Sequence, residues 1–161
     1  MHGEHRRNPG IRFRLAERAD VPAILALLAD DEISRQRGFG TVSEEVDAAV
    51  WQAFEAIDAD PGNELIVGVE AAEVVATCQL TFTPGLSRNG ASRMTVEAVR
   101  VRAGRRGGGL GRLMMAYAVD RARDRGCRIV QLTTDKRRTE ARRFYESLGF
   151  TASHEGMKLV L

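Results

Sequence analysis

The glycines of residues 99–112, which read VRVRAGRRGGGLGR, are the residues whose type and spacing most clearly predict chemistry. Apolar and charged residues alternate up to this glycine cluster, and apolar residues at helical spacing follow it, which predicts a strand, a tight turn and a helix start. The first turn of a helix binds anions because its N–H groups are unsatisfied and the helix dipole favours negative charge. Glycine permits positive φ and lets a phosphate approach the backbone. We therefore expect a phosphate or pyrophosphate site.

Two common phosphate-binding motifs do not fit these glycines. No Lys-Ser or Lys-Thr pair follows them, which excludes a Walker A loop. The Rossmann spacing Gly-x-Gly-x-x-Gly fails in both possible alignments, because an arginine replaces the second or the third glycine. The pattern that fits is Arg106-x-x-Gly109-x-Gly111. By itself, this pattern also allows a glycine-rich turn that binds nothing.

The elements that must position the glycines alternate between strands and helices. Strands are expected at residues 11–15, 64–70, 74–82, 92–102, 128–134, 150–153 and 157–161, with a hairpin turn at 71–73. Helices are expected from an N-cap at Asp20 to Leu28, from a capping box at residues 41–44 to Ile57, over 109–125 and over 138–148. This order predicts an α/β fold with a parallel pair of strands on either side of the third helix.

A second stretch, TEARRFYESLGF at residues 139–150, follows the glycines after one helix and one strand. Together the two stretches resemble the GNAT family of acetyl-CoA-dependent N-acetyltransferases. The arginine-glycine pattern matches the pyrophosphate loop of that family, and Ala141-x-x-Phe144-Tyr145-Glu146-x-x-Gly149-Phe150 matches its C-terminal helix motif. The resemblance implies a mixed, mostly antiparallel twisted sheet of about six to seven strands flanked by about four helices. A single domain of residues 11–161 would follow a disordered tail of residues 1–10.

The resemblance implies acetyl-CoA as the acetyl donor. Backbone groups of Val99, Arg100 and Val101 would hold the pantetheine arm like an added strand. The strands bearing Val99 and Gln131 would splay apart to admit the thioester. The family often has Asn where this chain has Arg138, which could reach a CoA phosphate or be solvated. The pyrophosphate would bind the backbone N–H groups of the turn, namely those of Arg106, Gly107, Gly108, Gly109, Leu110, Gly111 and Arg112.

The resemblance also implies direct acetyl transfer in a ternary complex, with Tyr145 as the general acid that protonates the CoA thiolate. A thiol pKa near ~8.5 and a tyrosine pKa near ~10 make this transfer uphill by only about 2 kcal/mol. Without the resemblance, Tyr145 would be interpreted as a core aromatic residue of an amphipathic helix.

Glu97 is the candidate general base because it is the one acid in the strand that leads to the glycines. Relatives that resemble glucosamine-phosphate N-acetyltransferases carry a Glu in the comparable strand. Proton transfer from an alkylammonium, with a pKa near ~10.4, to an ordinary glutamate, with a pKa near ~4.3, costs about 8 kcal/mol. The step therefore needs a carboxylate with a raised pKa, a less basic amine, or a water relay to solvent. The structural alternative is a solvated or ion-paired Glu97.

Composition indicates one globular domain: the chain has 161 residues, of which 43% are hydrophobic and 29% charged. No run approaches a membrane span and no signal-peptide pattern is present, so a cytoplasmic location is expected. Cys78 and Cys127 are too few for a disulfide framework and are expected to be buried thiols. No spacing of His, Cys and Asp suggests a metal site.

The net charge of +2 hides an asymmetry, because residues 1–80 hold 7 Arg and 15 acids while residues 81–161 hold 15 Arg, 2 Lys and 7 acids. This pattern fits either solvated helix faces or binding of a polyanion. A basic nucleic-acid-binding module is therefore an alternative, although one Trp and two Tyr offer no interleaved stacking platform. A catalytically inactive acetyl-CoA sensor is a second alternative.

The expected acceptor is the primary amine of a small molecule, such as an amino sugar phosphate, an amino acid or a polyamine, or of a peptide. Residues 30–41, 84–90 and 153–156 are expected to select it, and His154 is interpreted as a surface residue near that end. Arginines in or beside these segments would favour an anionic acceptor, namely Arg35, Arg37, Arg88 and Arg93. The strand expected at residues 157–161 could pair with a second copy of the chain and form a homodimer.

Overall fold

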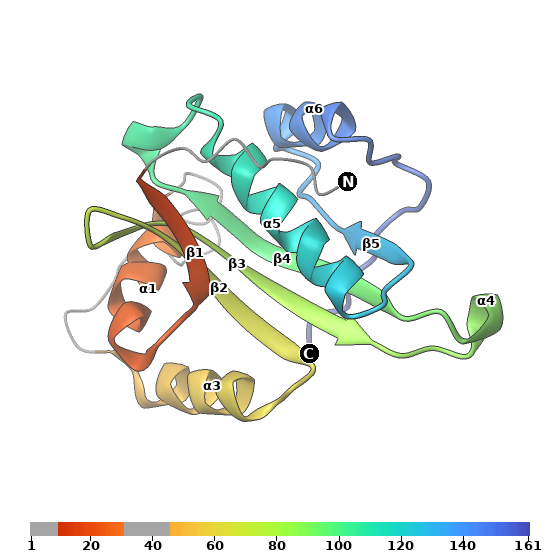
Figure 1. Cartoon of the computed structure of the whole chain (residues 1–161), viewed down its shortest axis with the longest axis horizontal. Helices are drawn as coiled ribbons and strands as arrows, with labels where there is room; N and C mark the ends of the chain where they lie inside the picture. Colours follow the sequence, from red (N-terminus) through yellow and green to blue (C-terminus); the bar gives the residue numbers. More distant parts are fainter. Residues whose placement is uncertain (1–9, 31–45) are drawn as a thin grey trace. The chain divides into compact units, whose positions relative to one another are not determined.

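The chain divides into two compact units, Met1–Gln131 and Leu132–Leu161, and the computed structural model describes residues 10–30 and 46–161. The tail at residues 1–9, most of the expected loop at 30–40, the capping box at 41–44, and Arg35 and Arg37 lie outside the described residues. The strands and α-helices, labelled in Figure 1, are β1 (Ile11–Leu15), α1 (Val21–Ala29), α3 (Ala48–Ala59), β2 (Asn63–Glu70), β3 (Glu73–Thr83), α4 (Ser87–Gly90), β4 (Arg93–Val101), α5 (Leu110–Asp124), β5 (Ile129–Leu132) and α6 (Thr139–Ser147). Two short 3-10 turns, η1 (Arg18–Asp20) and η2 (Ala103–Arg105), precede α1 and the glycines.

The described strands form one sheet in the order β1-β2-β3-β4-β5, and β1 to β4 are successively antiparallel. β5 runs parallel to β4. The Arg128 N–H donates to the Ser92 carbonyl (3.0 Å), and the Gln131 amide contacts the Thr95 hydroxyl (3.1 Å). The contacts advance by the same step along both strands, as parallel strands require. The predicted strand–helix–strand connection around α5 is therefore confirmed.

The two faces of the sheet carry different side chains because successive residues of a strand point to opposite sides. One face bears Ile66, Leu80 and Met94, which are fully buried, and α5 packs across it (Figure 1). The other face bears Val67, whose core cluster holds Ile24 of α1 and Phe54 of α3. Each large apolar side chain removed from water contributes about 1.5–3 kcal/mol. These two clusters hold the first unit together.

A buried ion pair fixes α5 to the sheet. Glu64 of β2 is buried and accepts two hydrogen bonds from the Arg121 guanidinium, at 2.8 and 3.0 Å. Arg125, the residue that caps the C-terminus of α5, lies 3.6 Å from the same carboxylate. Gly126 then ends the helix with φ +72°, the left-handed conformation expected after a helix.

The N-cap predicted at Asp20 is only half right. Asp20 does precede α1, but its carboxylate makes no capping hydrogen bond to that helix. It accepts instead from the Arg14 guanidinium (2.6 and 3.0 Å) and from the Glu17 N–H (2.7 Å). These hydrogen bonds hold the pKa of the Asp20 carboxyl below its usual value, against the effect of burial. A sequence pattern does not reveal this competition for one carboxylate.

The expected strand count of six to seven was wrong, because the described residues contain five strands. Residues 150–153 and 157–161 pair with no strand in the described part of the chain, and β5 is shorter than predicted. A segment with an alternating apolar pattern forms a strand only when a neighbouring strand supplies hydrogen-bond partners for its backbone groups. The described helices number five rather than about four, because the loop expected at residues 84–90 contains the short α4.

Candidate functional site

The glycine turn follows β4 and leads into α5, in the predicted order of strand, turn and helix, and the 3-10 turn η2, which was not predicted, lies between β4 and the glycines. Gly107 and Gly109 have φ of +83° and +81°, which L-residues adopt only with strain, and Gly109 occupies the N-cap of α5. A Cβ at either position would meet nothing within 4 Å. These two glycines are therefore required by the backbone conformation and not by crowding within the protein.

The start of α5 provides main-chain donors for an anion. The first hydrogen bond of this helix runs from the Leu113 N–H to the Gly109 carbonyl at 3.1 Å. The N–H groups of Leu110 and Gly111 precede it in the first helical turn, where donors have no intrahelical acceptor. The Arg106 N–H lies earlier, 3.4 Å from the Ala103 carbonyl. This arrangement suits a phosphate bound by backbone groups.

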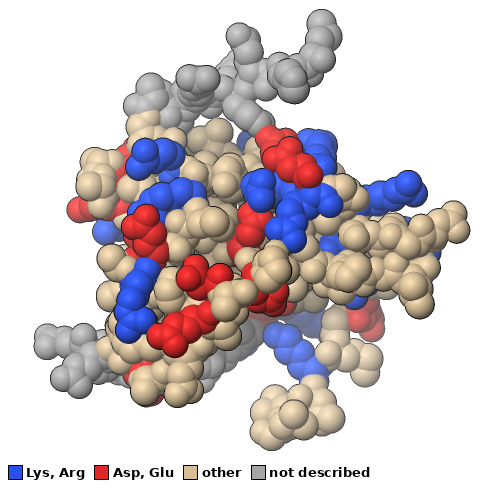
Figure 2. Space-filling model, turned by 60° about the horizontal axis from the view of Figure 1, so that its bottom comes forward, with Lys and Arg blue, Asp and Glu red and all other residues tan. Residues whose placement is uncertain are grey.

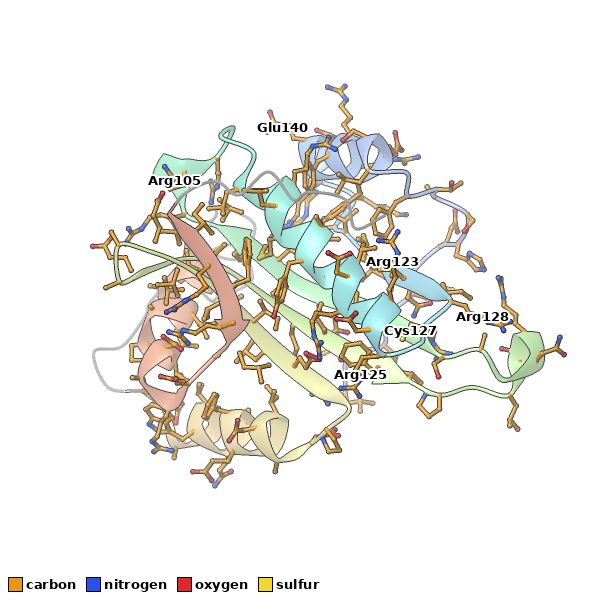
Figure 3. The ribbon with its side chains drawn as sticks, viewed as in Figure 1. Arg105, Arg123, Arg125, Cys127, Arg128 and Glu140 are labelled. Atoms are coloured by element: carbon orange, nitrogen blue, oxygen red, sulfur yellow. The ribbon has the colours of Figure 1, made fainter. Side chains whose placement is uncertain are left out.

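The arginine side chains around the turn hold the turn in place. Arg106 donates to the Val101 carbonyl and to the Asp30 carbonyl at the end of α1, both at 3.1 Å. Arg105 pairs with Glu70 at 2.8 Å, and Arg102 pairs with Glu73 at 2.6 Å. Figure 3 shows Arg105 at the opposite end of α5 from Arg125.

The two acids that hold these arginines lie on either side of one tight turn. Ala71 and Ala72 connect β2 to β3 with φ of 49° and 64°, and Glu70 pairs with Glu73 across this two-residue hairpin. The sequence predicted the hairpin but not its role. No spacing rule relates the acids at 70 and 73 to arginines about thirty residues later, so only the fold brings them together.

A β-bulge interrupts β4 directly before the strand reaches the glycine turn. Gln79 of β3 is opposite Glu97 and Thr77 is opposite Arg100, so Ala98 and Val99 together face one residue of β3. Ala98 has a φ of +52°. A bulge bends and twists a strand and redirects its side chains. β4 continues to Val101, six residues beyond Thr95, whose hydroxyl accepts a hydrogen bond from the Gln131 amide of β5.

Glu97 is exposed and lies one residue before this bulge. It makes no ion pair or hydrogen bond within the described part of the chain. Val96, its neighbour, is buried in the opposite face of the sheet. The carboxylate is therefore accessible to solvent and to a bound molecule, as a base that exchanges protons with water must be.

The second unit holds Tyr145 and Arg138. The Tyr145 ring is half-buried between Phe144 and Phe150, with ring centroids 5.2 and 5.9 Å apart. Gly149 follows α6 with φ +97°, and the Phe150 N–H donates to the Tyr145 carbonyl at 3.1 Å. The motif that predicted the helix therefore also fixes the tyrosine ring. Arg138 precedes α6, and its N–H donates to the Asp135 carbonyl at 2.9 Å.

The two cysteines and His154 lie among the described residues and differ in exposure. Cys78 is fully buried, and burial raises the pKa of its thiol to about 12. Cys127 is only half-buried. His154 is exposed and its Nδ1 lies 2.7 Å from the Ser153 hydroxyl. Within residues 10–30 and 46–161, no three potential metal-ligating side chains gather, and no helix is long and apolar enough to span a membrane.

Comparison with solved structures gives three informative relatives. A transcriptional regulator from Bacillus halodurans C-125 is 42% identical with a TM-score of 0.89, over 94% of this chain and 99% of that one. An acetyltransferase from Trypanosoma brucei is 25% identical with a TM-score of 0.75, over 94% and 99%. Glucosamine-6-phosphate N-acetyltransferase from Arabidopsis thaliana has a TM-score of 0.75 over 93% and 97%; at 23% identity, it shows the fold alone.

A search of curated protein sequences found no match. The model of the acetyltransferase (GNAT) family matches residues 22–150, which include the glycine turn, β4 and the helix that carries Tyr145. Proteins of this family use acetyl-CoA as the acetyl donor. The chain therefore belongs to the GNAT family of acetyltransferases.

Proposed function

We propose that this protein transfers the acetyl group of acetyl-CoA directly to a primary amine. The observation that carries the proposal is the exposed Glu97 carboxylate on the strand that leads into the glycine turn. A binding module needs the turn alone. An N-acetyltransferase also needs a group that accepts a proton from the acceptor, because an alkylammonium is not a nucleophile.

In the proposed reaction, the amine nitrogen attacks the thioester carbonyl, a C–N bond forms and the C–S bond breaks. The acceptor nitrogen loses two protons, one before it attacks as the free amine and one as the tetrahedral intermediate collapses. Glu97, through a water relay, takes each proton in turn and passes it to solvent, a route that its exposure supports. Tyr145 donates its phenolic proton to the departing CoA thiolate and is reprotonated from solvent. The turn from Arg106 to Arg112 holds the pyrophosphate, and residues 99–101 hold the pantetheine arm. Arg138 contacts a CoA phosphate in this proposal.

A second function, nucleic-acid binding, has one argument in its favour, because a relative at 42% identity is described as a transcriptional regulator. The charges oppose it. Many arginines of the second half pair with carboxylates of the same chain, including Arg102, Arg105, Arg121 and Arg142. Figure 2 shows basic and acidic side chains interspersed on the face it presents. Such a surface lacks the continuous basic stripe that binds phosphate backbones.

The acceptor classes that we propose are amino sugar phosphates, amino acids and polyamines, with peptides as a further class. The neighbour from Arabidopsis thaliana acts on glucosamine 6-phosphate, which makes an amino sugar phosphate a natural first compound to test. Arg88 is exposed in α4, and the Arg93 guanidinium lies near Gly85 of the preceding loop. Both could attract an anionic acceptor.

A homodimer is part of the proposal. Met157, Leu159, Val160 and Leu161 are all exposed in the second unit. An extended segment with exposed apolar side chains can bury them by adding to a sheet edge of a second copy. Light scattering should show a dimer for the full chain and a monomer after substitution of Leu159 and Leu161 by serine. A monomeric full chain would contradict this part of the proposal.

The function is tested by binding and then by turnover. Acetyl-CoA at 100 times its Kd should stabilise the protein by about 2.7 kcal/mol, which a rise in melting temperature reports. CoA release should then be measured with glucosamine 6-phosphate, lysine and spermidine as acceptors. No thermal shift at millimolar acetyl-CoA would refute donor binding, and a shift without transfer to any amine would favour the sensor. Salt-dependent DNA retention without an acetyl-CoA effect would favour the nucleic-acid module.

A further inference from the structure

A row of polar side chains crosses three strands beside Glu97. Asn63 of β2 is opposite Thr81 of β3, and Gln79 of β3 is opposite Glu97 of β4. All four side chains lie on the face of the sheet that bears Val67, and each is half-buried or exposed. We call these four residues the polar row. The sequence alone does not reveal the polar row, because the alternation of polar and apolar residues within each strand only indicates a solvated face.

The donors and acceptors of the polar row are fixed by Asp60, a neighbouring carboxylate that lies outside the row. A carboxylate only accepts hydrogen bonds, and the Asp60 Oδ2 accepts one from the Asn63 Nδ2 at 2.7 Å. The second carboxylate oxygen accepts from the Gly62 N–H, also at 2.7 Å. The Asn63 amide is thereby fixed with its oxygen directed to β3.

The orientation of Asn63 in turn fixes Gln79. The Asn63 Oδ1 is 3.2 Å from the Gln79 Nε2 and 3.1 Å from the Thr81 hydroxyl. An amide oxygen needs donors, so Gln79 must direct its NH₂ group to Asn63. The Gln79 Oε1 then remains as an acceptor, and it has no hydrogen bond among the residues that the structure describes.

This oxygen belongs to the residue directly opposite Glu97. Residues opposite each other in antiparallel strands have Cβ atoms about 4.5–5.5 Å apart. The amide oxygen and the carboxylate are both acceptors and cannot bond to each other, and Glu97 has no partner in the described residues. Acceptors on two directly opposite residues, one of them charged, favour a ligand group that is a cation and carries several N–H donors.

We propose that Gln79 and Glu97 together bind the ammonium group of the acceptor, and that Asp60 and Asn63 are positioning residues that hold the Gln79 oxygen toward it. This inference rests on the proposed function, because it assigns the acceptor side of the same reaction. It makes Gln79 a specificity-determining residue that selects a primary amine over an alcohol. A hydroxyl group offers one donor and no charge, so it satisfies the two acceptors poorly.

The test is a set of substitutions with KM for the best amine as the main measurement. Gln79→Met keeps the length of the side chain and removes the oxygen, and it should raise KM about tenfold with kcat changed much less. Thr81→Val is the matched control: it removes the other donor to Asn63 but no acceptor near Glu97, and KM should change less than twofold. The affinity for acetyl-CoA and the melting temperature of the free protein should stay as in the wild type.

The positioning role of Asn63 is tested by a double-mutant cycle. Asn63→Ala lets the Gln79 amide rotate and should raise KM about threefold. Adding Gln79→Met to Asn63→Ala should then cost much less than it does in the wild type, because Asn63 acts through Gln79. A full tenfold effect in both backgrounds would overturn the positioning role.

Failure of the inference differs from failure of the proposed function. An unchanged KM in Gln79→Met, with wild-type transfer to an amine intact, overturns the inference and leaves the function standing. If the wild type acetylates none of glucosamine 6-phosphate, lysine and spermidine, the function fails. Calorimetric titration of the same amines into the protein with CoA then decides the inference. Binding that Gln79→Met abolishes supports it, and equal or undetectable binding overturns it.

Discussion

Substitution of Gly109 by Ala should weaken acetyl-CoA binding through the backbone, although the new methyl group meets no protein atom. Gly109 has φ +81° and ψ 4°, and a Cβ there has nothing within 4 Å. An L-residue in this left-handed conformation costs about 1–2 kcal/mol. Gly108, the preceding residue in the same turn, has no left-handed φ, and a Cβ there would lie at an ordinary 3.6 Å from the Arg105 carbonyl oxygen. Gly108→Ala is therefore the matched control.

The strain of Gly109→Ala divides between two measurements. If the turn relaxes in the free protein, binding must restore the strained conformation. The Kd for acetyl-CoA, measured by calorimetry, then rises about 5- to 30-fold. If the turn cannot relax, the same energy lowers the melting temperature by about 2–8 °C. Gly109→Asn should be milder in both respects, since asparagine tolerates the left-handed region.

Two results would refute this reasoning. If Gly108→Ala weakens binding as much as Gly109→Ala, the glycines serve close approach of the phosphate and not the backbone conformation. If Gly109→Asn is as harmful as Gly109→Ala with Gly108→Ala harmless, φ is not what the position requires. The first result would also explain why three consecutive glycines occur where the conformation requires only Gly107 and Gly109.

The remaining predictions concern the reaction and stability. Tyr145→Phe should lower kcat about 10²-fold with little change in acetyl-CoA affinity, since only the proton donor is lost; unchanged turnover would exclude it as the acid. Glu97→Gln should reduce activity most at low pH, where the amine is protonated, and a loss that is uniform across pH would argue against a base. Folding lowers the pKa of Asp20, so its ionised carboxylate stabilises the folded protein fully at a pH above its unfolded-state pKa of ~3.9. This stabilisation is lost as the pH falls through the lower pKa of the folded state. Acid titration of Asp20→Asn should show a shallower loss of stability below about pH 4, and a curve parallel to that of the wild type would contradict this assignment.

The arginines around the turn show why residue type alone is a weak guide to role. A basic residue beside a glycine-rich phosphate loop is easily assigned to the phosphate. Here the Arg105 and Arg106 side chains are bonded to Glu70 and to the Val101 and Asp30 carbonyls. They connect the turn to the β2–β3 hairpin and to the end of α1. The side chains therefore contribute rigidity, and the main chain is the proposed contact of the phosphate.

Features that depend only on neighbouring residues can be predicted from the amino-acid order. Positive φ at Gly107, Gly109, Gly126 and Gly149 follows from the conformational freedom of glycine at turns and helix ends. Helix α5, which follows the glycine turn, is predicted from its apolar spacing. The two motifs, separated by one helix and one strand, led to the family that the comparison then showed. These signals are local, so they persist without knowledge of the fold.

Contacts between residues far apart in the sequence depend instead on the folded arrangement of the strands and helices. The bulge at Ala98, the ion pair between Glu64 and Arg121, and the alignment of Gln79 with Glu97 all depend on the register of strands far apart in sequence. The Asp20 carboxylate accepts hydrogen bonds from Arg14 and does not cap α1, because the fold brings the Arg14 guanidinium beside it. The strands expected after Gly149 fail for the same reason, since an alternating apolar segment becomes a strand only when another strand pairs with it.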